Sequence, residues 1–215
     1  MRAFGYSPGR PRRMRRLAVV LGLAAFLTIL VGRLIPAVAG TPDKRWPNGV
    51  VNVWAPKGGM RDTMFVAARR WTDSGARVSI RVVPNKDDAD VIVHRDDRRL
   101  VELCGRDCLG YSTSIGRPAD GSGEILLRSN LAGEPRSLNV WVAAHELGHV
   151  LGLHHRTGHD CSLMSPRAFD TNCAPSLASS RPTQDELACV PAPTDVDVAA
   201  GLYGGAAATR DPRCR

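Results

Sequence analysis

The sequence predicts an α/β fold, and the order of its segments carries that prediction. Three stretches have the apolar, β-branched composition of strands, at residues 50–54, 78–83 and 90–94. Between the first two, apolar residues recur at helical spacing before Gly75, which marks the end of the helix: Met60, Met64, Ala67, Ala68 and Trp71. Strand, helix, strand and strand in this order favour a sheet with a right-handed crossover.

Two weaker strand candidates follow, at residues 109–115 and 124–128. A glycine-rich turn at residues 120–123 separates them and favours a hairpin. Calcium held by Asp120 and Glu124 is the alternative interpretation of this turn.

The strongest chemical signal is the sequence HELGHVLGLHH, which begins at His145 and matches the pattern H-E-x-x-H-x-x-G-x-x-H. On a helix, His145 and His149 project from the same face toward one metal ion. Gly152 lets the chain leave the helix in a tight turn, and His155 returns as the third ligand. Three protein ligands with a fourth position open to water are typical of catalytic zinc.

Glu146 gives the predicted zinc site its chemistry. It is offset around the helix from the two histidines, so it can reach a zinc-bound water without being a ligand. As a general base it would take the proton of that water and deliver it to the departing amine. The adjacent His154 is expected at the surface, because the spacing of the motif selects His155.

The first 39 residues have the pattern of an export signal. Six arginines and no acid precede an apolar run at residues 17–31, and residues 37–39 (Ala-Val-Ala) supply a cleavage site. A cleaved secretory signal is favoured. The alternative is an uncleaved membrane anchor, because apolar character resumes after Arg33. Either way, the single domain expected at residues 40–215 would lie outside the cytoplasm.

The formal net charge of +8 arises mainly from that N-terminal segment. Residues 1–39 contain seven arginines and no acid, which leaves a net charge of +1 for the rest of the chain. Nucleic-acid binding is therefore excluded as the main function. We expect a monomer that acts on proteins or peptides.

All six cysteines follow the predicted export segment, and an even number in an oxidising compartment predicts disulfides. The sequence leaves the pairing open, although proximity favours Cys104 with Cys108 and Cys161 with Cys173, which leaves Cys189 for Cys214. A second metal site at the first pair is less favoured, because no further pair of ligands is nearby.

The motif that ends at His155 resembles that of the metzincin clan of zinc endopeptidases. Residues 163–166 (Leu-Met-Ser-Pro) also resemble the clan's Met-turn, in which Met164 would support the metal site from below without being a ligand. This resemblance implies the zincin fold, with a twisted mixed sheet, an active-site helix and a small C-terminal subdomain after the third histidine. It also implies one catalytic zinc ion.

Within the clan, the strand order and residues 197–204 look like those of matrixins. The cysteines that bracket the Met-turn are similar to those of snapalysins, which however have aspartate in place of His155. Animal matrixins carry a structural zinc held by several histidines, whereas this chain offers only His94 in that part of the sequence. Their pro-segment is also missing between Gly40 and the first strand. The resemblance therefore implies a compact secreted form with one zinc.

An extended substrate would add to an edge strand, for which residues 110–114 are the candidate. Residues 166–169 are expected to wall the pocket beyond the scissile bond. Two other classes remain. One is a secreted zinc-binding recognition module without catalysis, against which Glu146 argues. The other is a structural zinc protein, in which His154 or His159 would close the fourth position.

Overall fold

The computed structural model describes residues 44–133, 136–156, 162–166 and 191–208. The chain divides into two compact units, residues 1–42 and 43–215, and every described residue belongs to the second. The predicted export segment therefore lies outside the described residues. Within the described part, no helix is long and apolar enough to cross a membrane.

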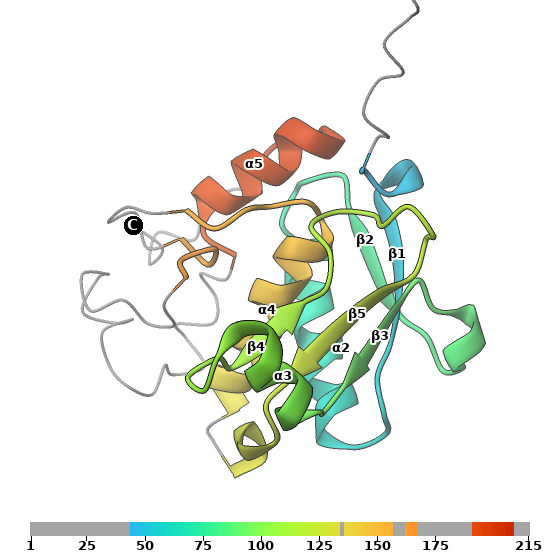
Figure 1. Cartoon of the computed structure of the whole chain (residues 1–215). Helices are drawn as coiled ribbons and strands as arrows, with labels where there is room; N and C mark the ends of the chain where they lie inside the picture. Colours follow the sequence, from blue (N-terminus) through green and yellow to red (C-terminus); the bar gives the residue numbers. More distant parts are fainter. Residues whose placement is uncertain (1–43, 134–135, 157–161, 167–190, 209–215) are drawn as a thin grey trace, which may run out of the picture. The chain divides into compact units, whose positions relative to one another are not determined.

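A five-stranded mixed sheet forms the centre of the domain (Figure 1). Its strands are β1 (Val50–Trp54), β2 (Ser79–Val82), β3 (Val91–His94), β4 (Gly110–Ser112) and β5 (Gly123–Leu127). They lie in the order β2-β1-β3-β5-β4, and β4 at one edge is antiparallel to its parallel-paired neighbour β5. All five strands expected from the sequence are present, so the predicted mixed sheet is confirmed.

Two helices, α2 (Gly59–Thr72) and α4 (Arg136–Val150), pack against each other and share one core with the sheet. The apolar residues predicted to face inward from α2 are all buried: Met60, Met64, Ala67, Ala68 and Trp71. Trp71 also donates a hydrogen bond from Nε1 to the carbonyl oxygen of Ala144, at 2.9 Å. This bond joins α2 to α4 directly before the first histidine of the motif.

Two further helices were not predicted. The first, α3 (Asp97–Cys104), begins where the Asp96 side chain accepts a hydrogen bond from the amide of Arg99. It contacts β4 and β5, and it is short and highly charged, so it offers no long apolar period to detect. The second is α5 (Pro193–Tyr203), near the end of the described chain.

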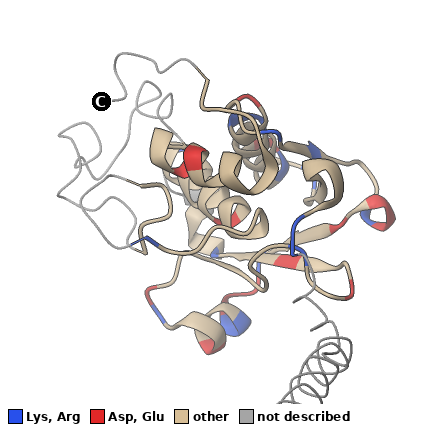
Figure 2. Cartoon of the chain, turned by 90° about the horizontal axis from the view of Figure 1, so that it is seen from above, with Lys and Arg blue, Asp and Glu red and all other residues tan. Residues whose placement is uncertain are grey.

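Three short 3-10 helices complete the described elements: η1 (Pro47–Gly49), η2 (Lys86–Asp88) and η3 (Ser129–Gly133). Basic and acidic residues are interspersed along the described ribbon (Figure 2). Charges of both signs are therefore mixed along this part of the chain, which fits the small net charge calculated without residues 1–39.

Candidate metal centre

The end of α4 and the turn after it bring the predicted ligands together. The helix ends at Val150, and Gly152 has a φ of +100°, a conformation that glycine adopts without steric cost. The amides of Gly152 and Leu153 donate to the carbonyls of His149 and Gly148, at 2.8 and 3.0 Å. The chain therefore reverses and carries the following residues back beneath the helix.

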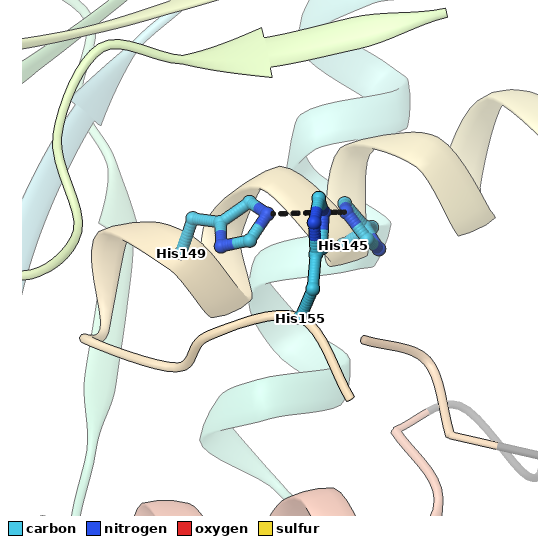
Figure 3. Close-up of side chains that lie close together, drawn as sticks. All are labelled: His145, His149 and His155. Carbon is cyan, nitrogen blue, oxygen red and sulfur yellow. Dashed lines mark hydrogen bonds between the residues drawn. The ribbon is translucent and has the colours of Figure 1, made fainter. Parts of the chain in front are cut away.

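His145, His149 and His155 point toward one another in this structure (Figure 3). Nε2 of His155 lies 3.2 Å from Nε2 of His145 and 3.1 Å from Nε2 of His149. Imidazoles on a tetrahedral zinc ion, with Zn–N bonds of about 2.0–2.1 Å, place their nitrogens about 3.3 Å apart. The spacing therefore fits one zinc ion. Within the described chain, this is the only cluster of three or more His, Cys, Asp or Glu residues suited to a metal.

Backbone carbonyls fix the orientation of the two helical histidines. Nδ1 of His145 lies 2.7 Å from the carbonyl oxygen of Leu163, and Nδ1 of His149 lies 2.8 Å from that of Leu153. A carbonyl oxygen can only accept, so each Nδ1 carries the proton and each Nε2 presents a lone pair to the centre. Metal-binding histidines are oriented by such outer hydrogen bonds.

Burial keeps these imidazoles neutral. It lowers the pKa of His145 to about 3, and the neighbouring His149 and His155 lower it further. Burial is also the main cause that lowers the pKa values of His149 and His155. Near neutral pH the three side chains can therefore bind a cation without first losing a proton.

Glu146 is buried beside the histidines, and its Oε2 has no hydrogen-bond partner. Burial raises the pKa of its carboxyl to about 8, and a hydrogen bond from the backbone of Ser112 opposes part of that increase. The backbone of β4 approaches closely, because a Cβ at Gly110 would lie 2.6 Å from Glu146 Oε1. A buried polar atom without a partner is uncommon and points to a missing ligand.

The turn around Met164 lies against the same helix. Met164 is fully buried, and a Cβ at Gly148 would collide with its Sδ. The amide of Arg156 donates to the Met164 carbonyl at 2.9 Å, which ties the segment after the third histidine to the turn. The structure thus places this methionine beside the helical turn that carries the histidines, where the resemblance expects it.

Asp195 in the first turn of α5 holds that segment, a role that was not predicted from the sequence. Its buried carboxylate accepts hydrogen bonds from the amide of Leu163 at 2.7 Å, from the amide of Ala192 at 3.1 Å and from the hydroxyl of Ser162. Burial raises the pKa of Asp195, while these bonds lower it. The available signal was an acid in the first turn of a helix, at its third position in the segment PTDVDVAAGLY.

A cleft of about 820 Å³ opens over the three histidines and Glu146. Its walls include all of β4 and the following residues to Ile115, so the candidate edge strand borders it. Trp141 also lines the cleft and stacks on His145, with ring centroids 5.4 Å apart. Pro166 contributes to the wall as expected, whereas residues 167–169 lie outside the described part. His154 is exposed at the rim.

The remaining predictions have mixed outcomes. Cys104 and Cys108 form a disulfide, as proximity suggested. The other four cysteines and His159 lie outside the described residues. At the proposed calcium turn, Glu124 pairs with Arg99, and the Asp120 carboxylate accepts a hydrogen bond from the amide of Ser122. Calcium binding there stays an untested alternative.

Comparison with solved structures supports the fold. The crystal structure of myroilysin aligns with a TM-score of 0.50 at 13% sequence identity, over 75% of this chain and 86% of that chain. A second myroilysin structure aligns with a TM-score of 0.41 at 17% identity, over 61% of this chain and 60% of that one. At such identities the first alignment shows a shared fold alone. No curated protein matches significantly.

The family comparison is more specific. The matrixin family matches residues 50–176, a segment that contains the sheet, α4 and all three histidines. The match covers more than half of the 215 residues. The chain therefore belongs to the matrixin family of metalloproteases, and its cluster of three histidines fits zinc.

Proposed function

We propose that this chain is a secreted zinc metalloendopeptidase in which Glu146 acts as the general base. One observation carries the proposal: three neutral imidazoles converge beside a buried carboxylate oxygen that has no partner. A structural zinc site would have a fourth protein ligand and no use for such an oxygen. The described part of the chain offers no fourth His, Cys, Asp or Glu in this cluster.

The chain supplies the ligands and the base. Zinc bound by His145, His149 and His155 would polarise the scissile carbonyl, acidify a bound water and favour the ionised form of the nearby carboxylate. Oε2 of Glu146 is free to receive the proton of the attacking water and to pass it to the departing amine. Without a metal, burial raises the pKa of this carboxyl to about 8, so its ionised form, which the base requires, depends on the cation beside it.

The edge strand supports an extended peptide as the substrate. One side of β4 pairs with β5, through Gly110 with Leu127 and Ser112 with Ile125. Its other side borders the cleft, where a peptide could add as a further strand. Main-chain hydrogen bonds would then hold the peptide across the three histidines, and the cleft would hold its side chains.

Secretion rests on two independent features. The arginine-rich and apolar segment at residues 1–39 has the pattern of a secretory signal, and an uncleaved anchor is the alternative. The Cys104–Cys108 disulfide fits an oxidising compartment, because such bonds rarely persist in the cytosol. Expressing the full chain in a bacterial host and sequencing the N-terminus of the exported protein tests export and cleavage of the segment. A product that keeps residues 1–39 in the membrane fraction favours the anchor, and a chain retained in the cytosol contradicts export.

The test of catalysis compares wild-type protein with Glu146→Gln. Glu102→Gln serves as a matched control, because Glu102 is exposed on α3 and does not line the cleft. Bound zinc is measured by elemental analysis, and cleavage is measured on casein. We expect equal zinc in all three proteins and a loss of about 10²-fold or more in cleavage for Glu146→Gln alone. Undiminished cleavage by Glu146→Gln contradicts its role as the base. Zinc binding without cleavage by any of the proteins favours the recognition module.

A further inference from the structure

The cleft is unevenly charged. Among the described residues, two carboxylates line it, those of Asp107 and Glu146, and no lysine or arginine does. Glu146 is buried beside the histidines, whereas Asp107 is exposed at the rim. Among the described residues, no basic group forms an ion pair with Asp107. In the described part of the cleft, the rim therefore carries one acidic side chain, that of Asp107, which can face a substrate.

The loop that carries Asp107 is fixed at both ends. A disulfide joins Cys104 at the end of α3 to Cys108, two residues before β4. Arg128, at the end of β5, donates to the carbonyl oxygens of Cys108 at 2.6 Å and Gly105 at 3.4 Å. Neither Arg128 nor Arg106, which directly precedes Asp107, lines the cleft. The cross-linked loop therefore holds the backbone from which the Asp107 side chain projects.

The position of Asp107 relative to β4 sets its distance from the scissile bond. Gly110 lies against the Glu146 carboxylate, and Asp107 precedes Gly110 by three residues. The chain turns at residues 106–107 before it runs into β4, so these three residues span at most about 10 Å. A peptide added to β4 with its scissile bond at Glu146 would therefore bring a side chain two to four residues away from that bond close to Asp107.

We propose that Asp107 makes this site selective for substrates with a lysine or arginine two to four residues from the scissile bond. The inference rests on the proposed peptidase function and names the class of peptide it prefers. A single charge of one sign in a cleft with apolar walls, such as Leu109 and Trp141, attracts the opposite charge and repels the like charge. Because Asp107 is exposed, the preference should be about threefold to tenfold and should weaken as salt is raised.

The experiment uses an internally quenched peptide that carries lysine, glutamine or glutamate in turn at each of four positions on both sides of the cleaved bond. The proteins compared are wild type, Asp107→Asn, Asp107→Lys and the control Asp87→Asn. Asp87 is an exposed acid on η2 outside the cleft. The readout is the ratio of kcat/KM for the lysine and glutamate peptides within each protein, so the overall activity of a variant cancels.

For wild type and Asp87→Asn, we expect a ratio of about three to ten at one position two to four residues from the cleaved bond. The ratio should fall to about one in Asp107→Asn and fall below one in Asp107→Lys. A wild type that cleaves the glutamine peptides without any charge preference overturns this inference and leaves the peptidase proposal standing. A preference that persists in Asp107→Asn also overturns it. A wild type that cleaves none of the peptides overturns both proposals.

Discussion

Two glutamates of this domain lie beside histidines, and their pKa values shift in opposite directions. Glu146 lies beside His145 under the cleft, and burial raises its pKa to about 8. Glu124 lies beside His94, with Oε1 3.3 Å from Nε2 of that histidine. Its pKa is lowered, mainly because Arg99 donates a hydrogen bond to it. Within the described residues, a glutamate beside a histidine therefore occurs twice, once with an arginine as its partner, at Glu124, and once without one, at Glu146.

The sheet separates the two sites. Along β3 the residues buried in the core, Val91 and Val93, alternate with Ile92 and His94. Glu124 pairs in register with Ile92, so it lies on the face away from α2 and α4. On that face Glu124 is paired with Arg99. On the helical face a carboxylate and three imidazoles are held together without a balancing cation among the described residues, which is the arrangement expected of a site that binds one.

The largest expected difference between the two sites is in metal binding. His149→Ala leaves two of the three converging imidazoles, so zinc affinity should fall by more than the 10- to 100-fold that is typical of losing an outer partner. His94→Ala should bind zinc as wild type does. Zinc affinity is measured by competition with a chromophoric chelator. Equal losses in both variants would show that zinc affinity does not depend on the imidazole cluster.

The pH dependence of stability should have opposite signs at the two glutamates. For metal-free protein, Glu146 has a folded pKa of about 8, above its unfolded value of 4.5. The folded state then holds the extra proton, so stability from this group is present below pH 4.5 and is lost as pH rises toward 8, by up to about 4 kcal/mol. The stability of metal-free Glu146→Gln relative to wild type should therefore increase as pH rises.

Glu124 provides the other half of that comparison. Its folded pKa lies below the unfolded value of 4.5, so its stabilisation is present above pH 4.5 and is lost as pH falls through the folded pKa. Glu124→Gln should therefore be less stable than wild type at pH 7, with a difference that shrinks in acid. Urea unfolding of metal-free proteins between pH 3 and pH 8 measures both variants. Parallel pH profiles would contradict the assignment of burial to one glutamate and pairing to the other.

A methyl group added at Gly110, where β4 packs against α4, should reduce activity more than one added at the exposed Gly201. A Cβ at Gly110 would lie within 3 Å of Glu146 Oε1 and of Val142 Cγ1, and both positions are held by α4. Gly110→Ala should displace the carboxylate and reduce kcat by about 100-fold, the effect of a misplacement of about 1 Å. Gly201→Ala on α5 meets nothing within 4 Å and should retain wild-type activity. Full activity of Gly110→Ala would show that the edge strand can move away from Glu146.

The sequence predicted the five strands, α2 and the three histidines because each depends on local spacing. The histidines at positions 145, 149 and 155 are fixed by one helix and one glycine turn, so their convergence follows from residues that are close in the chain. The short helix α3 was missed because it has too few apolar residues to show a helical spacing. The roles of Gly110 and Asp195 were missed because they depend on approaches between segments more than about 30 residues apart, which spacing alone does not reveal.

The smallest expected effect is at Asp195, which acts on the site through the backbone. Its carboxylate holds the Leu163 amide, and the Leu163 carbonyl in turn orients His145. Asp195→Asn keeps one acceptor oxygen and loses the other, so the turn should loosen and zinc affinity should fall by about tenfold. Asp62→Asn is the matched control, because Asp62 also lies in the first turn of a helix but is exposed. If zinc affinity holds while the melting temperature of metal-free Asp195→Asn falls, Asp195 anchors α5 alone. A fall in zinc affinity restored by Asp195→Glu would show that the carboxylate positions the histidine.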